Sequence, residues 1–351
     1  KNAAANGVNA RIAAASHALD RAQQASSVLA QLASQARAEL ITTPGIDALS
    51  SIELATANGP NGALLTDTQM QRASMQLDQM TPAQRATFER MLAAARSPLE
   101  AAYLWQALGA GHTLAQVQAF SAAIHPHGDD QGWLTSHLTP NMNTNQYPEY
   151  TFAQGSYDDC VPASTIVAQA EVDPVLMLSL TTGGTAHGDD SEEAFDNRLQ
   201  TMCLSQYVEG QSADGVLGPS PDSTAGVVYP VGGTALANQD LGAATGSTYH
   251  YQSLNSAADR AGVLNQVNQA VDAGKPVLID VTDGSVGHQM VIIGRSGDHL
   301  EVYNPWGVTG WTTDSQFVNG HLGSLTDPSL GGDSPPGGLP DPNGIELPDG
   351  P

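Results

Sequence analysis

Helix-start signals fill the first part of this sequence, whereas strand-like segments occur only near its end. The segments Thr81–Gln84, Ser97–Glu100 and Thr113–Gln116 each fit a capping box, in which two side chains bond backbone N–H groups that open a helix. Pro82 and Pro98 occupy first helical positions, where a backbone N–H is not needed. The helices that these signals predict cover residues 67–80, 82–95, 98–109 and 114–124.

Three apolar, β-branched segments near the end predict antiparallel strands. They read PVLIDVT (276–282), HQMVIIGR (288–295) and HLEVYNP (299–305), and Ser-Gly-Asp joins the last two as a hairpin. A chain with its helices first and its antiparallel strands last is typical of the α+β fold class. Between the two regions we expect helices over about 160–171, from 174, over 191–208 and over 256–273, and loops over most of 210–250.

Composition divides the chain into three parts. Residues 1–140, which begin with an Ala-rich stretch of helical periodicity, form a predicted α-helical module. Residues 141–325 hold mixed helices and strands and form a second domain. Residues 326–351 are rich in Gly, Pro and Asp and have too few apolar side chains to fold alone, which predicts a flexible tail.

Charge and apolar content exclude several classes of partner. The chain has 12 Lys+Arg and 36 Asp+Glu, a net charge of −24, and such a chain repels phosphate backbones and anionic lipid. No apolar run approaches the ~18 residues of a spanning helix, so neither nucleic-acid binding nor membrane insertion is expected. The 2 cysteines cannot build a disulfide scaffold or a thiolate-only metal site, and no cofactor is predicted.

Cys160 carries the signals of a reactive thiol. The thiolate is the nucleophile, and a helix N-terminus, a histidine and a group that orients this histidine all favour it. Pro162 and Asp159 place Cys160 at the start of a helix. His288 opens a strand after a glycine, and Asn304 ends the next strand, where its amide can fix the imidazole tautomer.

Gln154 precedes Cys160 by six residues and completes the predicted site. Its side-chain N–H and the Cys160 backbone N–H can stabilise an oxyanion. Asp158 and Asp159 leave two interpretations open. As a helix cap, Asp159 faces the helix amides, whereas carboxylates that face the thiol raise its pKa and suppress the thiolate.

These segments resemble those of a known family. QGSYDDC (154–160), GHQMVIIG (287–294) and VYNPWGVTGW (302–311) are similar to the three active-site blocks of papain-like cysteine peptidases of clan CA, and NPWG is most similar to the calpain branch. The chain order Cys–His–Asn is that of papain, with His 128 residues after Cys and Asn 16 residues after His. The resemblance covers about residues 150–320 and implies a papain-like fold, with a helical lobe and an antiparallel sheet lobe.

The resemblance implies that the protein is an enzyme that hydrolyses peptide bonds in a protein or peptide substrate. The multiple disulfides of secreted papains are missing from this sequence, which favours bacterial or intracellular relatives. The roles that the family implies are Cys160 as nucleophile, His288 as base and later acid, Asn304 as orienting residue, Gln154 as oxyanion donor and Trp306 as a shield of the Asn–His hydrogen bond.

Other interpretations of the same residues stay open. Transglutaminases, deamidases and peptidoglycan amidases use the same thiol chemistry with a different acceptor. A further alternative is an inactive binding module on a peptidase scaffold, and Val161 departs from the family, which usually has an aromatic residue there. Cys203 is expected to be a small buried hydrophobe, and Trp311 is expected in the core or the wall of the site.

The motif HGDD occurs twice, at His127–Asp130 and at His187–Asp190. His and Asp at close range can bind a divalent ion. An Asp-rich turn before a helix N-cap is the favoured explanation, as DDSEEAF after His187 indicates, so no metal site is predicted.

The helical module over 1–140 has two possible roles. It is either a pro-region that covers the cleft in an autoinhibitory contact or an adaptor for a secretion system. Its Ala- and Gln-rich, acidic composition and the Gly/Pro tail are similar to those of bacterial exported effectors and toxins. The protein is therefore expected to be secreted or delivered to a target cell, although no signal peptide is visible in the sequence.

Overall fold

A computed structural model of the chain describes the residues that form its helices, sheet and candidate site. The described residues are 58–59, 62–63, 65–140, 150–155, 159–220, 231–282, 287–320, 322 and 341–350. The helices predicted within residues 1–40 lie outside the described residues.

The first described helices begin where their capping signals lie. The predicted boxes at Thr81 and Thr113 are complete, with the glutamine three residues later bonded in both directions. At the third site the box is not completed: Ser97 accepts from Glu100 N–H, but the Glu100 carboxylate accepts from the backbone N–H of Arg96 instead. The helices are α3 (Asp67–Gln79), α4 (Pro82–Ala94), α5 (Pro98–Gly109), α6 (Leu114–Ile124) and α7 (Gln131–Leu138), as predicted for the first four.

A six-stranded antiparallel sheet forms the other half of the fold. Its strand order is β3-β8-β4-β5-β6-β7, so a strand from the end of the chain lies inside the sheet. The predicted strands and the hairpin over Ser-Gly-Asp are confirmed as β4, β5 and β6. The strands are β3 (Tyr249–Ser253), β4 (Val277–Thr282), β5 (Gly287–Ser296), β6 (His299–Asn304), β7 (Val308–Thr313) and β8 (Asp341–Pro348).

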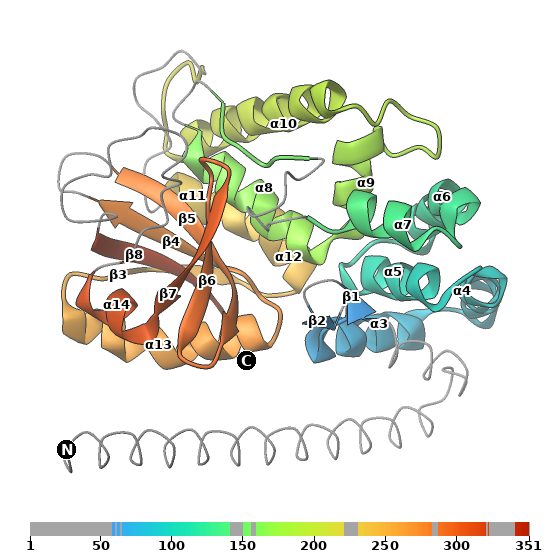
Figure 1. Ribbon diagram of the computed structural model, residues 1–351, viewed down its shortest axis with the longest axis horizontal. Helices are drawn as coiled ribbons and strands as arrows, with labels where there is room; N and C mark the ends of the chain where they lie inside the picture. The colour runs from blue at the N-terminus through green and yellow to red at the C-terminus, as the bar shows by residue number, and fades with distance from the viewer. Residues whose placement is uncertain are drawn as a thin grey trace, which may run out of the picture. The chain divides into compact units, whose positions relative to one another are not determined.

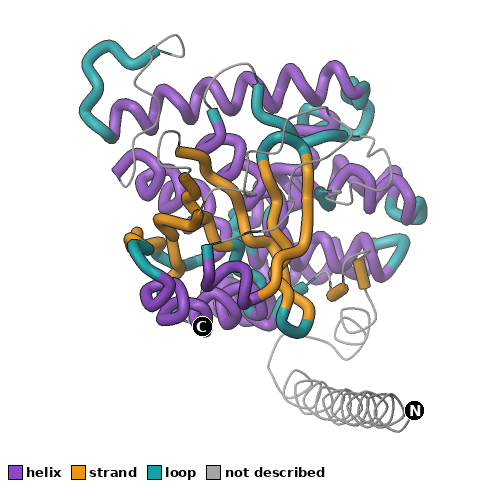
Figure 2. Tube along the Cα trace, turned by 60° about the vertical axis from the view of Figure 1, so that its left-hand side comes forward, coloured by secondary structure: helices purple, strands orange, loops and turns teal. Residues whose placement is uncertain are grey.

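Helices cover both faces of this sheet (Figure 1, Figure 2). Side chains alternate along a strand, so one face of β4 and β5 presents Leu278 and Val291 to α8 (Cys160–Val172). The other face presents Ile279 and Met290 to α13 (Ala257–Asp272). The remaining helices are α9 (Pro174–Thr182), α10 (Glu192–Ala213), α11 (Val231–Leu236), the π-helical η2 (Ala237–Leu241), α12 (Gly242–Thr245) and α14 (Asp314–Asn319). This arrangement of helices and antiparallel sheet is of the α+β class.

The prediction of a flexible tail over 326–351 is wrong for its last part. Residues 341–348 form β8, which pairs with β3 on one side and β4 on the other. Pro342 favoured the prediction of a linker, because proline lacks the backbone N–H that a strand ladder requires. In the fold Pro342 lies beside a register shift of β4, where proline is tolerated, and Ile345 is fully buried against α13. Residues 326–340 lie outside the described residues.

Two further expectations differ from the structure. Residues 231–245 are helical rather than loop, although the sequence there is rich in Gly. The predicted boundary between residues 140 and 141 does not separate two compact units, since one unit runs from Ala57 to Pro351. Gln69 Nε2 of α3 donates to the Val172 carbonyl at 3.1 Å, and His112 Nε2 lies 2.8 Å from Asp173 Oδ1, which ties the early helices to the end of α8. Within the described residues, no helix has the length and apolar content needed to cross a membrane.

Candidate active site

Helix α8 begins with Cys160, whose side chain is 9% exposed. One turn later, Ser164 Oγ–H donates to the Gln289 carbonyl of β5 at 3.0 Å. Residues four apart on a helix lie on the same face, so Cys160 and Ser164 both face the sheet. The N-terminus of α8, which favours a thiolate, therefore lies at the part of the sheet where β5 begins.

The direction of α8 sets which end of β5 Cys160 approaches. Near the end of α8, burial first and the charge of Glu301 second raise the pKa of Glu171, so Glu171 lies in the neighbourhood of Glu301. Glu301 is paired with Gly294, near the end of β5. With Ser164 bonded to Gln289 and Glu171 in the neighbourhood of Glu301, the strand partner of Gly294, we infer that α8 runs in the same direction as β5. Cys160 therefore lies toward the first residues of β5, which include His288.

His288 and Asn304 form a buried hydrogen-bonded pair. His288 Nε2 lies 2.9 Å from Asn304 Oδ1, and the two side chains are 8% and 0% exposed. The backbone N–H of Trp306 also donates to Asn304 Oδ1, at 3.1 Å. Because a backbone N–H can only donate, the Asn304 atom that it meets must be the oxygen, and His288 Nε2 must carry a proton. The opposite ring nitrogen, Nδ1, is then the one that can accept a proton in the neutral imidazole.

The surroundings of His288 favour its neutral form. Burial lowers the pKa of His288 below its ordinary value, and the hydrogen bond that His288 donates to Asn304 opposes this shift. Trp306 stacks on the imidazole, with ring centroids 4.8 Å apart and an interplanar angle of 26°. The indole is 46% exposed and so stands between the ring and solvent. This position agrees with a shielding role for Trp306.

Gln154 lies on a segment that runs beside the Asn304 turn. Its backbone N–H donates to the Pro305 carbonyl at 2.6 Å, which brings it next to the residue that follows Asn304. The side-chain Oε1 of Gln154 is buried and has no hydrogen-bond partner among the described residues. A buried polar atom without a partner costs about 1–3 kcal/mol, and because this oxygen can only accept, an oxyanion role belongs to the Nε2–H group of the same amide.

Asp159 does not cap α8, and that interpretation is wrong. Its side chain makes no capping hydrogen bond, because its backbone (φ −98°, ψ 27°) is outside the extended conformation of an N-cap. The carboxylate is fully buried and accepts from Gly155 N–H at 3.5 Å. Its charge also acts on Cys203 of α10, where burial first and Asp159 second raise the pKa of the thiol. Cys203 is fully buried, as expected for an inert thiol, and Asp158 lies outside the described residues.

The departure at Val161 is accommodated by neighbouring helices. Val161 is 2% exposed and packs in one cluster with Cys160, Tyr207 of α10 and Leu236 of α11. The cluster that contains the cysteine therefore includes an aromatic side chain, but it comes from another part of the chain. Trp311, by contrast, is 49% exposed on the edge strand β7, so of the two expected places, the core and the wall of the site, the core is wrong.

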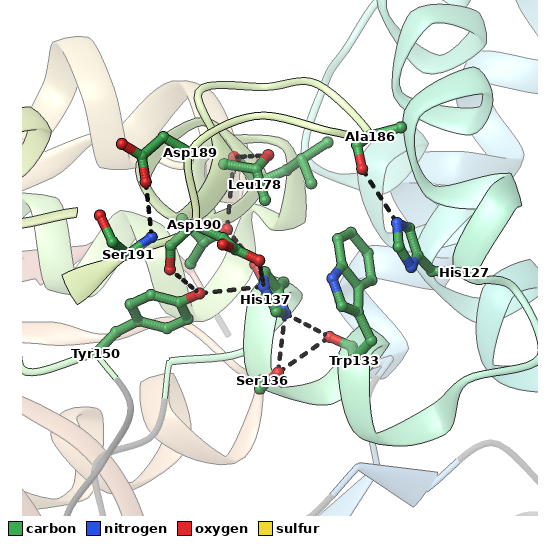
Figure 3. A network of polar contacts seen from close by, with 12 residues as sticks. His127, Trp133, Ser136, His137, Tyr150, Leu178, Ala186, Asp189, Asp190 and Ser191 are labelled. Carbon is green, nitrogen blue, oxygen red and sulfur yellow. Dashed lines mark hydrogen bonds and ion pairs between the residues drawn. The ribbon is translucent and has the colours of Figure 1, made fainter. Parts of the chain in front are cut away.

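The two HGDD segments approach each other where His127 Nε2 lies 3.1 Å from the Ala186 carbonyl (Figure 3). The rings of His127 and His187 lie 6.4 Å apart, and His127 stacks on Trp133 with ring centroids 3.8 Å apart. Asp130 accepts from Trp133 N–H at 3.0 Å and so caps α7, as predicted. In the described part of the chain, no group of three or more His, Cys, Asp or Glu side chains is arranged to hold a metal ion.

Hydrogen bonds connect Gln154, His288 and Asn304 at one end of strands β5 and β6, and Cys160 begins the helix that packs on β5. Gln154 and Asn304 meet through Pro305, His288 bonds Asn304, and the helix that starts at Cys160 packs on the strand that starts beside His288. Ser164 and Tyr303, which hold these segments together, carry no signal in the sequence because their partners lie 125 and 151 residues away. Comparison with protein-family models and with curated proteins finds no match.

Proposed function

We propose that this protein is a cysteine peptidase of papain-like fold that hydrolyses peptide bonds. The observation that carries the proposal is the buried His288–Asn304 hydrogen bond of 2.9 Å. The Trp306 N–H, which donates to the same Asn304 oxygen, fixes the tautomer of His288. The pair lies at the end of β5 toward which the Cys160 helix points. A base held in one tautomer beside a helix N-terminus is what activation of a thiol requires.

The reaction begins with proton transfer from the Cys160 thiol to His288 Nδ1. The thiolate then attacks the carbonyl carbon of the scissile amide and forms a C–S bond, while the carbonyl oxygen becomes an oxyanion. The Gln154 side-chain amide and the Cys160 backbone N–H stabilise this oxyanion. The C–N bond breaks as His288 gives its proton to the leaving amine, which leaves a thioester on Cys160.

Hydrolysis of the thioester returns the enzyme to its first state. His288 Nδ1 takes a proton from water as the oxygen attacks the thioester carbonyl, and the C–S bond then breaks. The acid product leaves, and the proton returns to the Cys160 sulfur. Asn304 keeps Nε2 protonated through both half-reactions and stabilises the imidazolium that forms in each.

The test compares substitution of the two cysteines. Cys160→Ala should abolish hydrolysis of casein and of fluorogenic peptide amides, whereas Cys203→Ala, which removes the inert buried thiol, should retain it. In the parent chain, iodoacetamide should modify Cys160 near neutral pH and leave Cys203 intact. Hydrolysis by Cys160→Ala at the parent rate would show the proposal to be wrong.

Intact-mass analysis of the protein substrate after the same reaction identifies the acceptor of the acyl group. Peptide fragments support hydrolysis of the chain. A gain of ~1 Da on intact substrate indicates deamidation, and a mass equal to two linked chains indicates transglutamination, both by the same thioester. Absence of any change together with an unreactive Cys160 would favour a binding module.

A further inference from the structure

The segment that carries Gln154 is held on one side by the Asn304 strand. Tyr303, the residue before Asn304, is buried, and its hydroxyl donates to the Phe152 carbonyl at 2.6 Å. Two residues further along both segments, Gln154 N–H donates to the Pro305 carbonyl at 2.6 Å. The residue that orients His288 and the residue proposed to bind the oxyanion are therefore attached to the same turn.

Helix α10 holds the segment on the other side. Gln200 Nε2 donates to the Ala153 carbonyl at 3.2 Å. The same side chain lies against Gly155, where an added Cβ would be only 2.0 Å from Gln200 Oε1. Gly155 N–H is in turn directed at Asp159 Oδ2, at 3.5 Å. Four successive residues, 152–155, thus each have a backbone group bonded to a residue outside the segment.

The upstream end of the segment is fixed as well, in the network of Figure 3. The Tyr150 hydroxyl donates to the Asp190 carbonyl at 2.9 Å and lies 3.1 Å from His137 Nε2 of α7. The aromatic ring of Tyr150 is buried and packs on Phe195 of α10, with ring centroids 5.1 Å apart. The chain from Tyr150 to Gly155 is consequently held at both ends, although it belongs to no helix or strand.

We infer that Tyr303 and Gln200 are positioning residues for the oxyanion site, an inference that rests on the proposed function. They bond the carbonyls of Phe152 and Ala153 and so set where the Gln154 amide stands. Oxyanion stabilisation depends on donors placed before the reaction, within a few tenths of an ångström of the developing charge. Loosening the segment should therefore weaken transition-state binding more than substrate binding.

The experiment uses the full chain and two pairs of matched variants. Tyr303→Phe removes the hydroxyl that holds Phe152, and its control is Tyr249→Phe, which removes an equally buried hydroxyl that donates to the Pro276 carbonyl at 3.0 Å. Gln200→Ala has Gln206→Ala as its control, because Gln206 lies on the same helix and bonds Asp240 instead. Each is assayed for kcat and KM on a fluorogenic peptide amide and for the rate of iodoacetamide alkylation of Cys160.

Amide hydrolysis and alkylation respond differently to the oxyanion site. Alkylation by iodoacetamide forms no oxyanion and reports only the thiolate. Tyr303→Phe and Gln200→Ala should lower kcat by at least about 10-fold with KM and the alkylation rate within about twofold of the parent. The two control variants should keep kcat within about twofold. Combined with Gln154→Ala, Tyr303→Phe should lower kcat no further, because both act through one amide.

The outcomes separate this inference from the proposed function. A parent chain that hydrolyses amides while Tyr303→Phe and Gln200→Ala match their controls would overturn the positioning role alone. A parallel fall of kcat and alkylation rate would also overturn it, since the residues would then act on the thiol rather than on Gln154. A parent chain with neither hydrolysis nor a reactive Cys160 would overturn both.

Discussion

The contact between Ser164 and Gln289 links the stability of the fold to the reactivity of the candidate nucleophile. Ser164 is fully buried, and its hydroxyl donates across the interface between α8 and β5 at 3.0 Å. Ser164→Ala removes this hydrogen bond and leaves a carbonyl partly unsatisfied, which should lower the free energy of unfolding by about 1–2 kcal/mol. For a unit of this size, that loss lowers the Tm by a few degrees.

The Ser164→Ala substitution should also lower the rate at which the Cys160 thiol reacts. Ser164 fixes α8 one turn after Cys160, and small misplacements of reacting groups reduce rates by up to ~100-fold. We therefore expect iodoacetamide to alkylate Cys160 in Ser164→Ala several-fold more slowly than in the parent at neutral pH. Urea unfolding measures the first effect, and mass spectrometry of alkylated peptides measures the second.

Thr165 supplies the matched control. Its hydroxyl is equally buried but donates to the Val161 carbonyl within α8, at 3.0 Å, and so does not link the helix to the sheet. Thr165→Val should lose a similar stability and leave the alkylation rate within about twofold of the parent. If the two variants alkylate at the same rate, the reasoning that docking of α8 on β5 sets the reactivity of Cys160 is wrong.

Three further results are expected. In a Cys160→Ala background, NMR titration should give His288 a pKa below 6.5, and a pKa above 6.5 would contradict the buried site. Adding Asn304→Asp should raise the pKa of His288, because a carboxylate favours the imidazolium. Burial first and a neighbouring carboxylate second raise the pKa of Glu171 from 4.5 to about 8. The contribution of Glu171 to the free energy of unfolding is therefore fully present below pH 4.5 and is lost as the pH rises through about 8. Glu171→Gln should therefore gain up to about 1.4 kcal/mol on the parent for each pH unit in this window, and identical urea profiles from pH 5 to 8 would argue against it. Ile345→Ala should lower the free energy of unfolding by about 2–4 kcal/mol because the side chain is fully buried in β8, whereas a flexible tail would show no change.

The parts of the fold that the sequence predicts are those fixed by short-range chemistry. The capping box at Thr81 acts over four residues, so the start of α4 can be found without knowledge of the rest of the chain. The hairpin of β5 and β6 likewise depends on two adjacent apolar segments and one turn. Strand β8 has no such signal, because its pairing with β3 and β4 involves partners about 60–100 residues away. In addition, only Ile345 and Leu347 of this strand belong to the apolar cluster between the sheet and α13.

The candidate site likewise has features that the sequence predicts and features that it does not. The spacing and order of Cys160, His288 and Asn304 are visible in the sequence, because the side chains that carry the chemistry must be of particular types. The direction of the Asp159 side chain was not predictable from the sequence, because it depends on the backbone angles at the start of α8 and on the neighbouring helix α10. Tyr303 gave no signal either, since a buried tyrosine reads as ordinary core until its hydroxyl is seen at the Phe152 carbonyl.

The central claim, that Cys160 forms a thioester with a carbonyl substrate, can be tested in one measurement. The chain is mixed with the p-nitrophenyl ester of a blocked peptide, quenched in acid within seconds, and digested for mass spectrometry. The mass of the acyl group should appear on the peptide that contains Cys160 and should be absent from Cys160→Ala. No acyl adduct in the parent chain, or an adduct on Cys203 or another residue, would contradict the claim.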